Sequence, residues 1–145
     1  MHEDNEIEGG DAACWAHMFE QQEDAPSGEP STPGGVSLTE VAEAARRSGP
    51  AWTAASDDLN VNLLVFTSGE GVGEHVNTEV DVLMIGISGS GTLSIDGTER
   101  AFRAGDAVLI PKGARRSTRA GDGPFAYLTC HRRRAGLWPK RVVSR

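Results

Sequence analysis

Three ionisable or charged side chains in the middle of the chain have types and settings that suit chemistry. His75 follows a glycine-rich segment and begins a run of β-type residues, where it can either contact a ligand or bond a neighbouring carboxylate or carbonyl. Asp81 lies within the apolar run VDVLMIGI and needs a partner, because an isolated carboxylate is too costly to bury. Arg116 is the first candidate partner and Arg115 the second, since a guanidinium offers a planar fork to a carboxylate. An internal ion pair and a ligand-binding pair are therefore both open for this set.

Short β-strands must position these residues. From residue 60 onward, runs rich in β-branched and aromatic residues are separated by Gly, Asp, Asn or Pro. No helical segment interrupts them, which predicts an all-β antiparallel sandwich or barrel rather than alternating strands and helices. Asp96 and Gly97 separate two of the runs and predict a type I′ hairpin, because both central residues of that turn need positive φ. The runs are NVNLLVF, VDVLMIGI, TLSI, ERAFR, AVLI and FAYLTCH.

The 145 residues fit one domain with flanking segments of different composition. Residues 1–35 hold nine of the 21 acidic residues and no Lys or Arg, which predicts a disordered acidic tail. Residues 36–50 have a capping-box pair of Ser and Glu followed by apolar residues at helical spacing, and they predict one short amphipathic helix. Residues 51–135 are expected to form the β-domain and residues 136–145 a basic C-terminal tail.

The strand region resembles the cupins, a family of small jelly-roll barrels also described as double-stranded β-helices. The first cupin motif consists of Gly, His, a second His, Glu and a closing Gly at fixed spacing. The opening Gly and first His are matched, the latter by His75, whereas Asn77 stands at the second His and Asp81 at the Glu. Gly89 follows Asp81 one residue late, so Val82 competes for the acidic position unless a bulge in this strand reconciles the two.

The second cupin motif is matched more closely. Its glycines and proline are present as Gly105, Pro111 and Gly113, but Arg116 stands at the position of its His. Fixed glycine and proline offsets reflect turn geometry, so the resemblance, which covers about residues 60–131, is specific for fold. It implies a cupin barrel and no particular reaction, because cupins include enzymes, binding domains and storage proteins.

In the cupin family that this chain resembles, the complete site consists of three His and one Glu around a divalent transition metal. Here the resemblance implies a degenerate site, because Asn77 offers a weak amide oxygen and Arg116 is a permanent cation that repels metal ions. We therefore expect no cofactor, and a pocket of His75, Asn77, Asp81 and Arg116 that binds a small anionic molecule as a metal-independent binding or regulatory module. The alternative is a metal-dependent enzyme of oxygenase or isomerase type, with a divalent transition metal held by His75 together with Asp81 or Glu79 and an unplaced second His. A third hypothesis is an interaction domain whose barrel edges and tail contact other proteins. No residue is assigned as catalytic.

Basic residues gather late in the chain. Arg115, Arg116 and Arg119 are predicted to share a loop, and His131 with the three following arginines comes after the last strand. Such clusters can contact nucleic acid, but outside the acidic tail 12 acidic residues balance 14 basic ones and no DNA-binding motif is present. We therefore expect no nucleic-acid partner, and expect the acidic tail to shield these basic residues.

Two further expectations concern assembly and location. An exposed edge strand favours a homodimer through a sheet edge. No apolar run approaches the length of a membrane span, and the acidic start of the sequence differs from a signal peptide, so no membrane partner and a cytoplasmic location are predicted.

Overall fold

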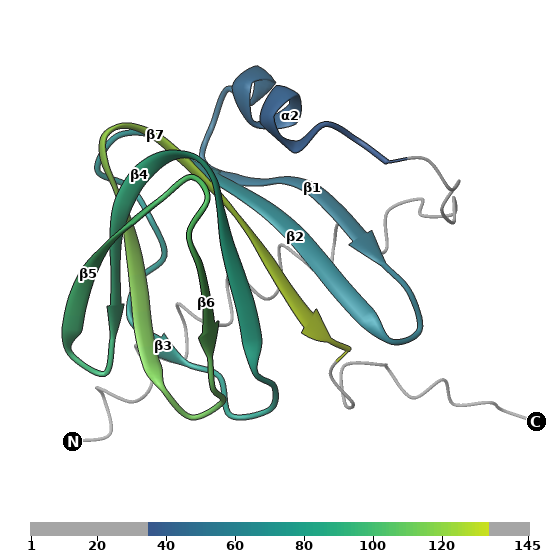
Figure 1. The fold of residues 1–145 in the computed structure, drawn as a ribbon, viewed down its shortest axis with the longest axis vertical. Helices are drawn as coiled ribbons and strands as arrows, with labels where there is room; N and C mark the ends of the chain where they lie inside the picture. The colour runs from purple at the N-terminus through teal and green to yellow at the C-terminus, as the bar shows by residue number, and fades with distance from the viewer. Residues whose placement is uncertain (1–34, 134–145) are drawn as a thin grey trace, which may run out of the picture.

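Antiparallel strands make up most of the protein in this computed structural model, which describes residues 35–133 (Figure 1). Within that range one helix precedes seven strands, which confirms the predicted all-β class with one short N-terminal helix. The elements are α2 Leu38–Ala44, β1 Gly49–Ala55, β2 Leu59–Phe66, β3 His75–Val76, β4 Val82–Ile95, β5 Thr98–Arg103, β6 Ala107–Ile110 and β7 Arg115–Arg132. The tails predicted over 1–35 and 136–145, and the expected shielding by the acidic tail, lie outside the described residues apart from Gly35.

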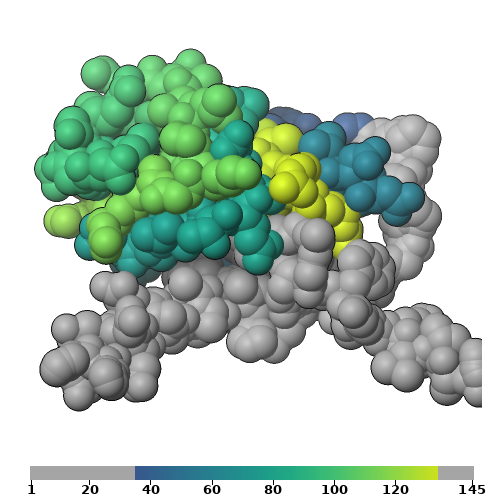
Figure 2. Space-filling model, turned by 90° about the horizontal axis from the view of Figure 1, so that it is seen from below, coloured from purple at the N-terminus to yellow at the C-terminus, as the bar shows by residue number. Residues whose placement is uncertain are grey.

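Two long strands, β4 and β7, bend and contribute to both sheets of a barrel. The first part of β4 lies between β6 and the last part of β7, and its second part lies between β5 and the first part of β7. The hairpin of β1 and β2 extends the first sheet beyond β7, and β3 extends the second. Figure 2 shows the end of β7, in yellow, between the blue β1–β2 hairpin and the green strands of the barrel. The sheet orders are therefore β1-β2-β7-β4-β6 and β3-β7-β4-β5.

Glycines form the bend in β4. The register of β4 against β7 shifts between Gly86 and Ser88, where one extra residue of β4 forms a β-bulge, and the pairing is interrupted again between Gly89 and Gly91. Gly89 has a φ of 72°, and a Cβ at this position would lie only 1.9 Å from the carbonyl oxygen of Pro124. Close approach of the β7 backbone thus requires glycine at the point where β4 passes from one sheet to the other.

The turn between β4 and β5 has the predicted geometry. Asp96 has a φ of 50° and Gly97 a φ of 87°, and the flanking Ile95 and Thr98 are paired, which confirms the two-residue hairpin. The Asp96 carboxylate also accepts a hydrogen bond from the backbone N–H of Arg115 at 3.0 Å. The hairpin is therefore attached to the first residue of β7.

The N-terminal helix is shorter than the predicted segment 36–50. Ser37 caps it by accepting a hydrogen bond from the Glu40 N–H at 3.3 Å, and it ends at Ala44. Gly49 is already paired with Val65, so Gly49 and Pro50, the last residues of the predicted helical segment, begin β1 instead. Pairing with β2 accounts for this early change from helix to strand.

Alternation along β2 divides the apolar residues between two cores. Leu64 and Phe66 point into the barrel, whereas Leu63 and Val65 point to the opposite face, where they pack with Ala42 of α2. The helix therefore covers part of one sheet and leaves the barrel interior to residues of both sheets. The barrel core consists of Leu64, Phe66, Met84, Leu93, Phe102, Ile110, Ala114, Ala120, Phe125 and Tyr127.

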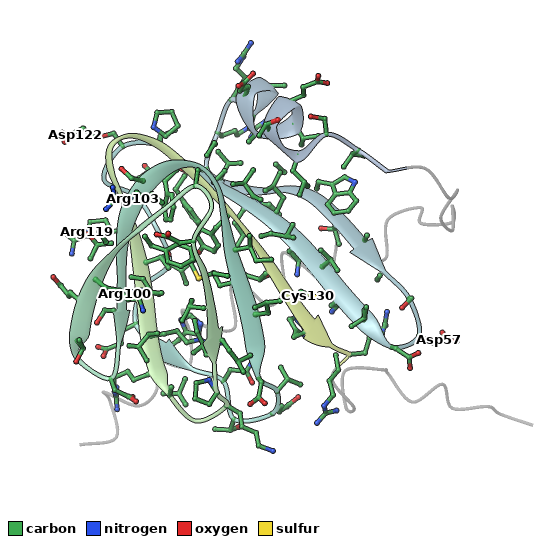
Figure 3. The ribbon with its side chains drawn as sticks, in the orientation of Figure 1. Asp57, Arg100, Arg103, Arg119, Asp122 and Cys130 are labelled. Carbon is green, nitrogen blue, oxygen red and sulfur yellow. The ribbon has the colours of Figure 1, made fainter. Side chains whose placement is uncertain are left out.

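The predicted basic loop is wrong, because Arg115, Arg116 and Arg119 belong to β7. Alternation then separates them. Arg116 lies inside the barrel with only 8% of its surface exposed, whereas Arg115 and Arg119 are exposed. Figure 3 shows Arg119 with Arg100 and Arg103 near β5. Hydrogen bonding to β3 and β4 forms a strand here although the segment RRSTR is polar.

No helix within residues 35–133 has the length and apolar character needed to cross a membrane.

Gly89→Ala is expected to lower the free energy of unfolding by about 1–3 kcal/mol more than Gly97→Ala, because of overpacking. Both glycines have positive φ, so both variants carry the cost of a left-handed backbone, but a Cβ at Gly97 meets no atom within 4 Å. Denaturant unfolding followed by circular dichroism measures the difference. Equal losses in the two variants would contradict the close approach of Pro124.

Candidate ligand-binding site

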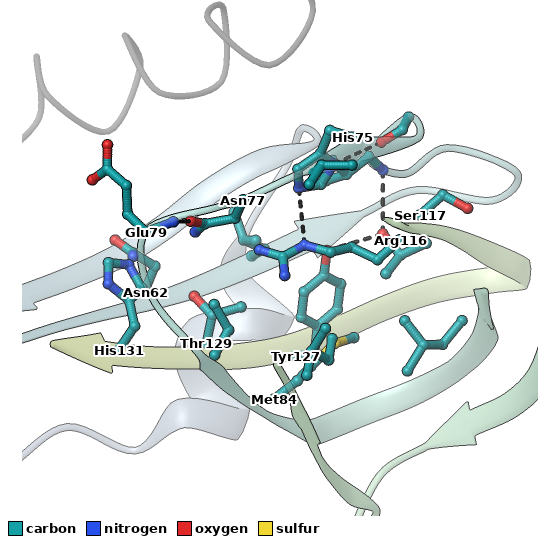
Figure 4. Close-up of a pocket in the computed structure, with 18 of the residues that line it drawn as sticks. Asn62, His75, Asn77, Glu79, Met84, Arg116, Ser117, Tyr127, Thr129 and His131 are labelled. Atoms are coloured by element: carbon teal, nitrogen blue, oxygen red, sulfur yellow. Dashed lines mark hydrogen bonds between the residues drawn. The ribbon is translucent and has the colours of Figure 1, made fainter. Parts of the chain in front are cut away.

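A cavity of about 270 Å³ lies inside the barrel between the two sheets. Its apolar wall comes from residues of β2, β4 and β6, and its polar side chains come mainly from β2, β3 and β7 and the segment after β3 (Figure 4). Several polar groups thus converge on a space that is otherwise apolar, as in small-molecule sites. The polar residues that bear most on function are Asn62, His75, Asn77, Arg116, Tyr127 and Thr129.

His75 and Arg116 form the central polar contact. They are opposite one another in the β3–β7 pair, and the Arg116 Nε donates to the His75 Nε2 at 3.3 Å. The other ring nitrogen, Nδ1, lies 2.8 Å from the carbonyl oxygen of Gly73 and must carry a proton to bond it. We therefore assign a neutral His75 with its proton on Nδ1 and its Nε2 lone pair directed at the guanidinium.

Asn77 presents a donor to the same cavity. Its side chain is 8% exposed, and its Oδ1 accepts hydrogen bonds from the backbone N–H groups of Glu79 at 2.8 Å and Val80 at 3.2 Å. Its buried Nδ2 has no hydrogen-bond partner among residues 35–133. Since a buried donor without a partner costs about 1–3 kcal/mol, this amide is suited to meet an acceptor on a ligand.

Tyr127 contributes a neutral phenol. It is 3% exposed, and its hydroxyl lies 3.0 Å from the Thr118 hydroxyl, which joins the two halves of β7 across the barrel. Burial raises the pKa of Tyr127 well above its usual value, although the Thr118 hydrogen bond and the Arg116 charge act in the opposite direction. The phenol therefore stays protonated and serves as a hydrogen-bonding group rather than an anion.

The structure places Asp81 outside the cavity, which corrects its predicted site role. Asp81 is exposed, and its carboxylate accepts the backbone N–H of Lys112 at 2.8 Å. Val82, the next residue, is buried and lines the cavity, because β4 directs alternate residues inward. The register shifts of β4 lie further along the strand and do not reverse this facing. The predicted pairing of Asp81 with Arg116 is likewise replaced by the contact between Arg116 and His75.

Of the predicted site residues, His75, Asn77 and Arg116 come together in the cavity. Glu79, one of the alternative metal ligands, lies exposed at the mouth, and Figure 4 shows its carboxylate directed away from Arg116.

Sequence reasoning missed three polar residues of the cavity. Asn62, Tyr127 and Thr129 all face inward from β2 and β7, two neighbouring strands of the first sheet. Strict alternation within NVNLLVF and FAYLTCH contains this signal, since it places these residues on the same faces as the core residues Leu64 and Phe125.

Solved structures with the same architecture are found in several bacteria. A protein from Bacillus halodurans has a TM-score of 0.64 at 18% identity over 74% of this chain and 86% of that chain. A cupin protein from Bacteroides fragilis has a TM-score of 0.53 at 23% identity over 66% and 84% of the two chains. A cupin superfamily protein from Desulfitobacterium hafniense has a TM-score of 0.57 at 22% identity over 70% and 92%. The chain has the cupin fold.

This confirms the resemblance read from the motif glycines and proline. No protein-family model matches the sequence, and no curated protein is similar to it in sequence. Because the structural similarity is accompanied by low sequence identity, it establishes the cupin fold and leaves the activity to be argued from the site.

The cupin fold implies a metal, and the residues present do not fit one. The four motif positions hold His75, Asn77, Val82 and Arg116. The imidazole lone pair faces a guanidinium, the amide oxygen already accepts two backbone N–H groups, and the other two side chains are an alkyl group and a cation. Within residues 35–133 no three His, Cys, Asp or Glu side chains are grouped so as to hold a metal ion.

Titration of Tyr127 tests the buried phenol, since it is the only tyrosine of the chain. Because burial raises its pKa, the folded state keeps a proton that the unfolded state releases above about pH 10. The contribution of protonated Tyr127 to the free energy of unfolding is therefore complete below that pH and declines above it. We expect phenolate absorbance to rise only together with unfolding.

Tyr127→Phe is the control for that titration. The variant should lose about 1 kcal/mol of stability at neutral pH with the Thr118 hydrogen bond. The stability difference between the two proteins should shrink above about pH 10. Ionisation of Tyr127 at its ordinary pKa in the folded protein would contradict the assignment.

Proposed function

We propose that this cupin-fold protein is a metal-independent binding or regulatory module that holds a small anionic molecule inside its barrel. The observation that carries the proposal is Arg116, a guanidinium almost wholly buried in the cavity at the position where the motif has a His. A fixed positive charge among apolar walls attracts an anion more strongly than it would in water, because the local dielectric constant is lower.

The position of the guanidinium supports recognition rather than a purely structural role. His75 accepts from Nε at 3.3 Å, so it helps to hold the guanidinium in one orientation. A carboxylate binds such a fork through two parallel hydrogen bonds, and a preoriented fork loses little entropy on binding. His75 thereby acts as the residue that positions Arg116.

Asn77 supports the same conclusion independently. Its Nδ2 is a buried donor that faces the cavity and has no partner within the described residues, so a ligand acceptor would satisfy it. A guanidinium and an amide donor together suit an anion that has more than one acceptor oxygen.

Binding of benzoate, followed by calorimetry or ligand-observed NMR, tests the anion site. Arg116→Met should lower the affinity at least about tenfold, because a charge-assisted hydrogen bond is lost. Arg116→Lys should retain part of the affinity. The matched control is Arg115→Met, because the Arg115 side chain is 50% exposed and pairs with Glu74 at 3.6 Å. Equal affinity in the Arg116→Met and Arg115→Met variants would contradict the proposal.

Metal content tests the other half of the proposal. Full-length protein purified without an affinity tag should contain far less than one equivalent of any transition metal, and a chelator should leave its benzoate affinity and thermal stability unchanged. One metal per chain that is lost in the His75→Ala variant would overturn metal independence and favour a cupin enzyme. The Asp81→Ala variant is the control, since Asp81 lies outside the cavity.

A further inference from the structure

We infer that the outer face of the first sheet is a docking surface for a second copy of this chain, and that two copies form a two-fold symmetric dimer through it. The inference concerns a different surface from the anion site and goes beyond the proposed function. It is carried by the apolar character of this face, by its exposure and by the features that disfavour pairing at the edges of the same sheet.

Apolar side chains occupy both faces of the first sheet. Val82, Met84 and Tyr127 point into the barrel, so their neighbours along β4 and β7 point outward. An antiparallel sheet with one face in water ordinarily carries polar residues there. The outward residues of four neighbouring strands are apolar instead, and together they are named the outer patch: Leu59, Val61, Leu83, Ile85, Leu109, Leu128 and Cys130.

The second sheet offers a comparison within the same strands, because β4 and β7 belong to both sheets. In its part of β4, Thr92 and Ser94 flank the buried Leu93 and therefore point outward. In its part of β7, Ser117 and Arg119 are paired with them on the same face. The outward residues of these strands are thus polar in the second sheet and apolar in the first, which indicates that a partner covers the face of the first.

The outer patch is exposed in the single chain. The helix α2 lies at one end of this face, where it packs against Leu63 and Val65 (Figure 1). Beyond the helix, Leu83 is 38% exposed, Leu59 47% and Leu109 63%. These are three of the five large apolar residues that are exposed among residues 35–133. Covering them removes apolar surface from water, which favours association.

The charges around the outer patch suit a second copy. None of its seven residues is charged, and one residue of each sign borders it, Asp81 just before β4 and Arg132 at the end of β7. A two-fold contact brings equal surfaces together, so a patch with a net charge would repel its own copy. The outer patch avoids this repulsion, whereas a strongly charged partner would find no opposite charge on it.

The area of the outer patch is sufficient for a small dimer interface. Four strands about 4.8 Å apart and three outward rows about 6.8 Å apart give a flat area of about 400 Å². Two such faces in contact bury about 800 Å², and the relief of the side chains adds to this value. This is the small end of specific interfaces, so we expect a reversible dimer.

The edges of the first sheet are less suited to pairing than its face, so this dimer differs from the sheet-edge dimer expected from the sequence. On one edge, β1 contains Pro50, which has no N–H, and its register shifts between Pro50 and Trp52. On the other edge, β6 has only four residues. Prolines, bulges and short strands all disfavour pairing between edges.

Sedimentation velocity of the full-length protein tests the dimer. We expect reversible dimerisation at micromolar concentrations. Leu83→Glu should raise the dissociation constant at least about hundredfold, because two-fold symmetry brings two carboxylates into one apolar interface. The matched control is Val76→Glu, since Val76 is 39% exposed but lies on β3 in the second sheet. It should leave the dissociation constant unchanged, and circular dichroism shows whether both variants are folded.

Cys130 provides a second measurement that needs no charged variant. It lies within the outer patch on the central strand β7, between Val61 and Leu83, and is partly exposed. Replacing Cys14 by Ser makes it the only thiol of the chain. Its reaction with a thiol reagent should slow about tenfold when the protein concentration is raised from well below the dissociation constant to about fifty times that value.

Three outcomes would overturn the inference. One is a protein that stays monomeric at micromolar concentrations, and another is a dimer that Leu83→Glu and Val76→Glu affect equally. The third is a Cys130 thiol that is shielded to the same degree at every concentration, since another part of the chain would then cover the outer patch. If Leu83→Glu does not fold, Leu109→Glu takes its place, because that residue is more exposed. The anion site is judged separately, by benzoate binding.

Discussion

The hydrogen bond between Arg116 and His75 is the contact on which the proposed chemistry depends. It directs the lone pair of the histidine Nε2 at a guanidinium, and it brings a permanent positive charge into the barrel. A buried charged side chain must keep a fixed position, because its desolvation cost must be offset by well-placed partners. The hydrogen bond that the other ring nitrogen donates to the Gly73 carbonyl therefore matters as well, since it fixes the tautomer that lets His75 accept from a cation. One backbone carbonyl thus determines how the guanidinium is presented.

Much of the fold could be predicted from the sequence because its turns carry specific residues. The Asp96–Gly97 hairpin forms as its two residue types require. Gly69, which is the opening Gly of the first motif, and Gly105 and Gly113 of the second all have positive φ. The residues at which strands begin and end could be predicted less well. The segment RRSTR has no apolar alternation, so it was predicted to be a loop, and only its pairing with β3 and β4 makes it part of β7. Long-range pairing of this kind leaves no local signal.

The site could be predicted only in part, because neighbouring residues of a strand point to opposite faces of the sheet. His75, Asn77 and Arg116 were placed correctly because motif spacing fixes their register. Asp81 and Val82 differ by one position, and a shift of one residue in a strand exchanges the inner and outer faces. The sequence contains arguments for either register, and the inward direction of Met84 decides in favour of Val82. Reading the same alternation along β2 would have drawn attention to Asn62.

The strand β7 runs through both sheets without a break, and its two halves face each other across the cavity, where Thr118 meets Tyr127. Arg116 and Thr129, which both line the cavity, are thus carried by one continuous strand rather than by separate loops. Specificity in such an arrangement cannot be exchanged by replacing a loop, as it can in folds whose sites lie on connecting segments. It must change through single substitutions at inward positions that also belong to the core. Evolution of this pocket is therefore restricted to steps that the packing of the whole barrel can accept.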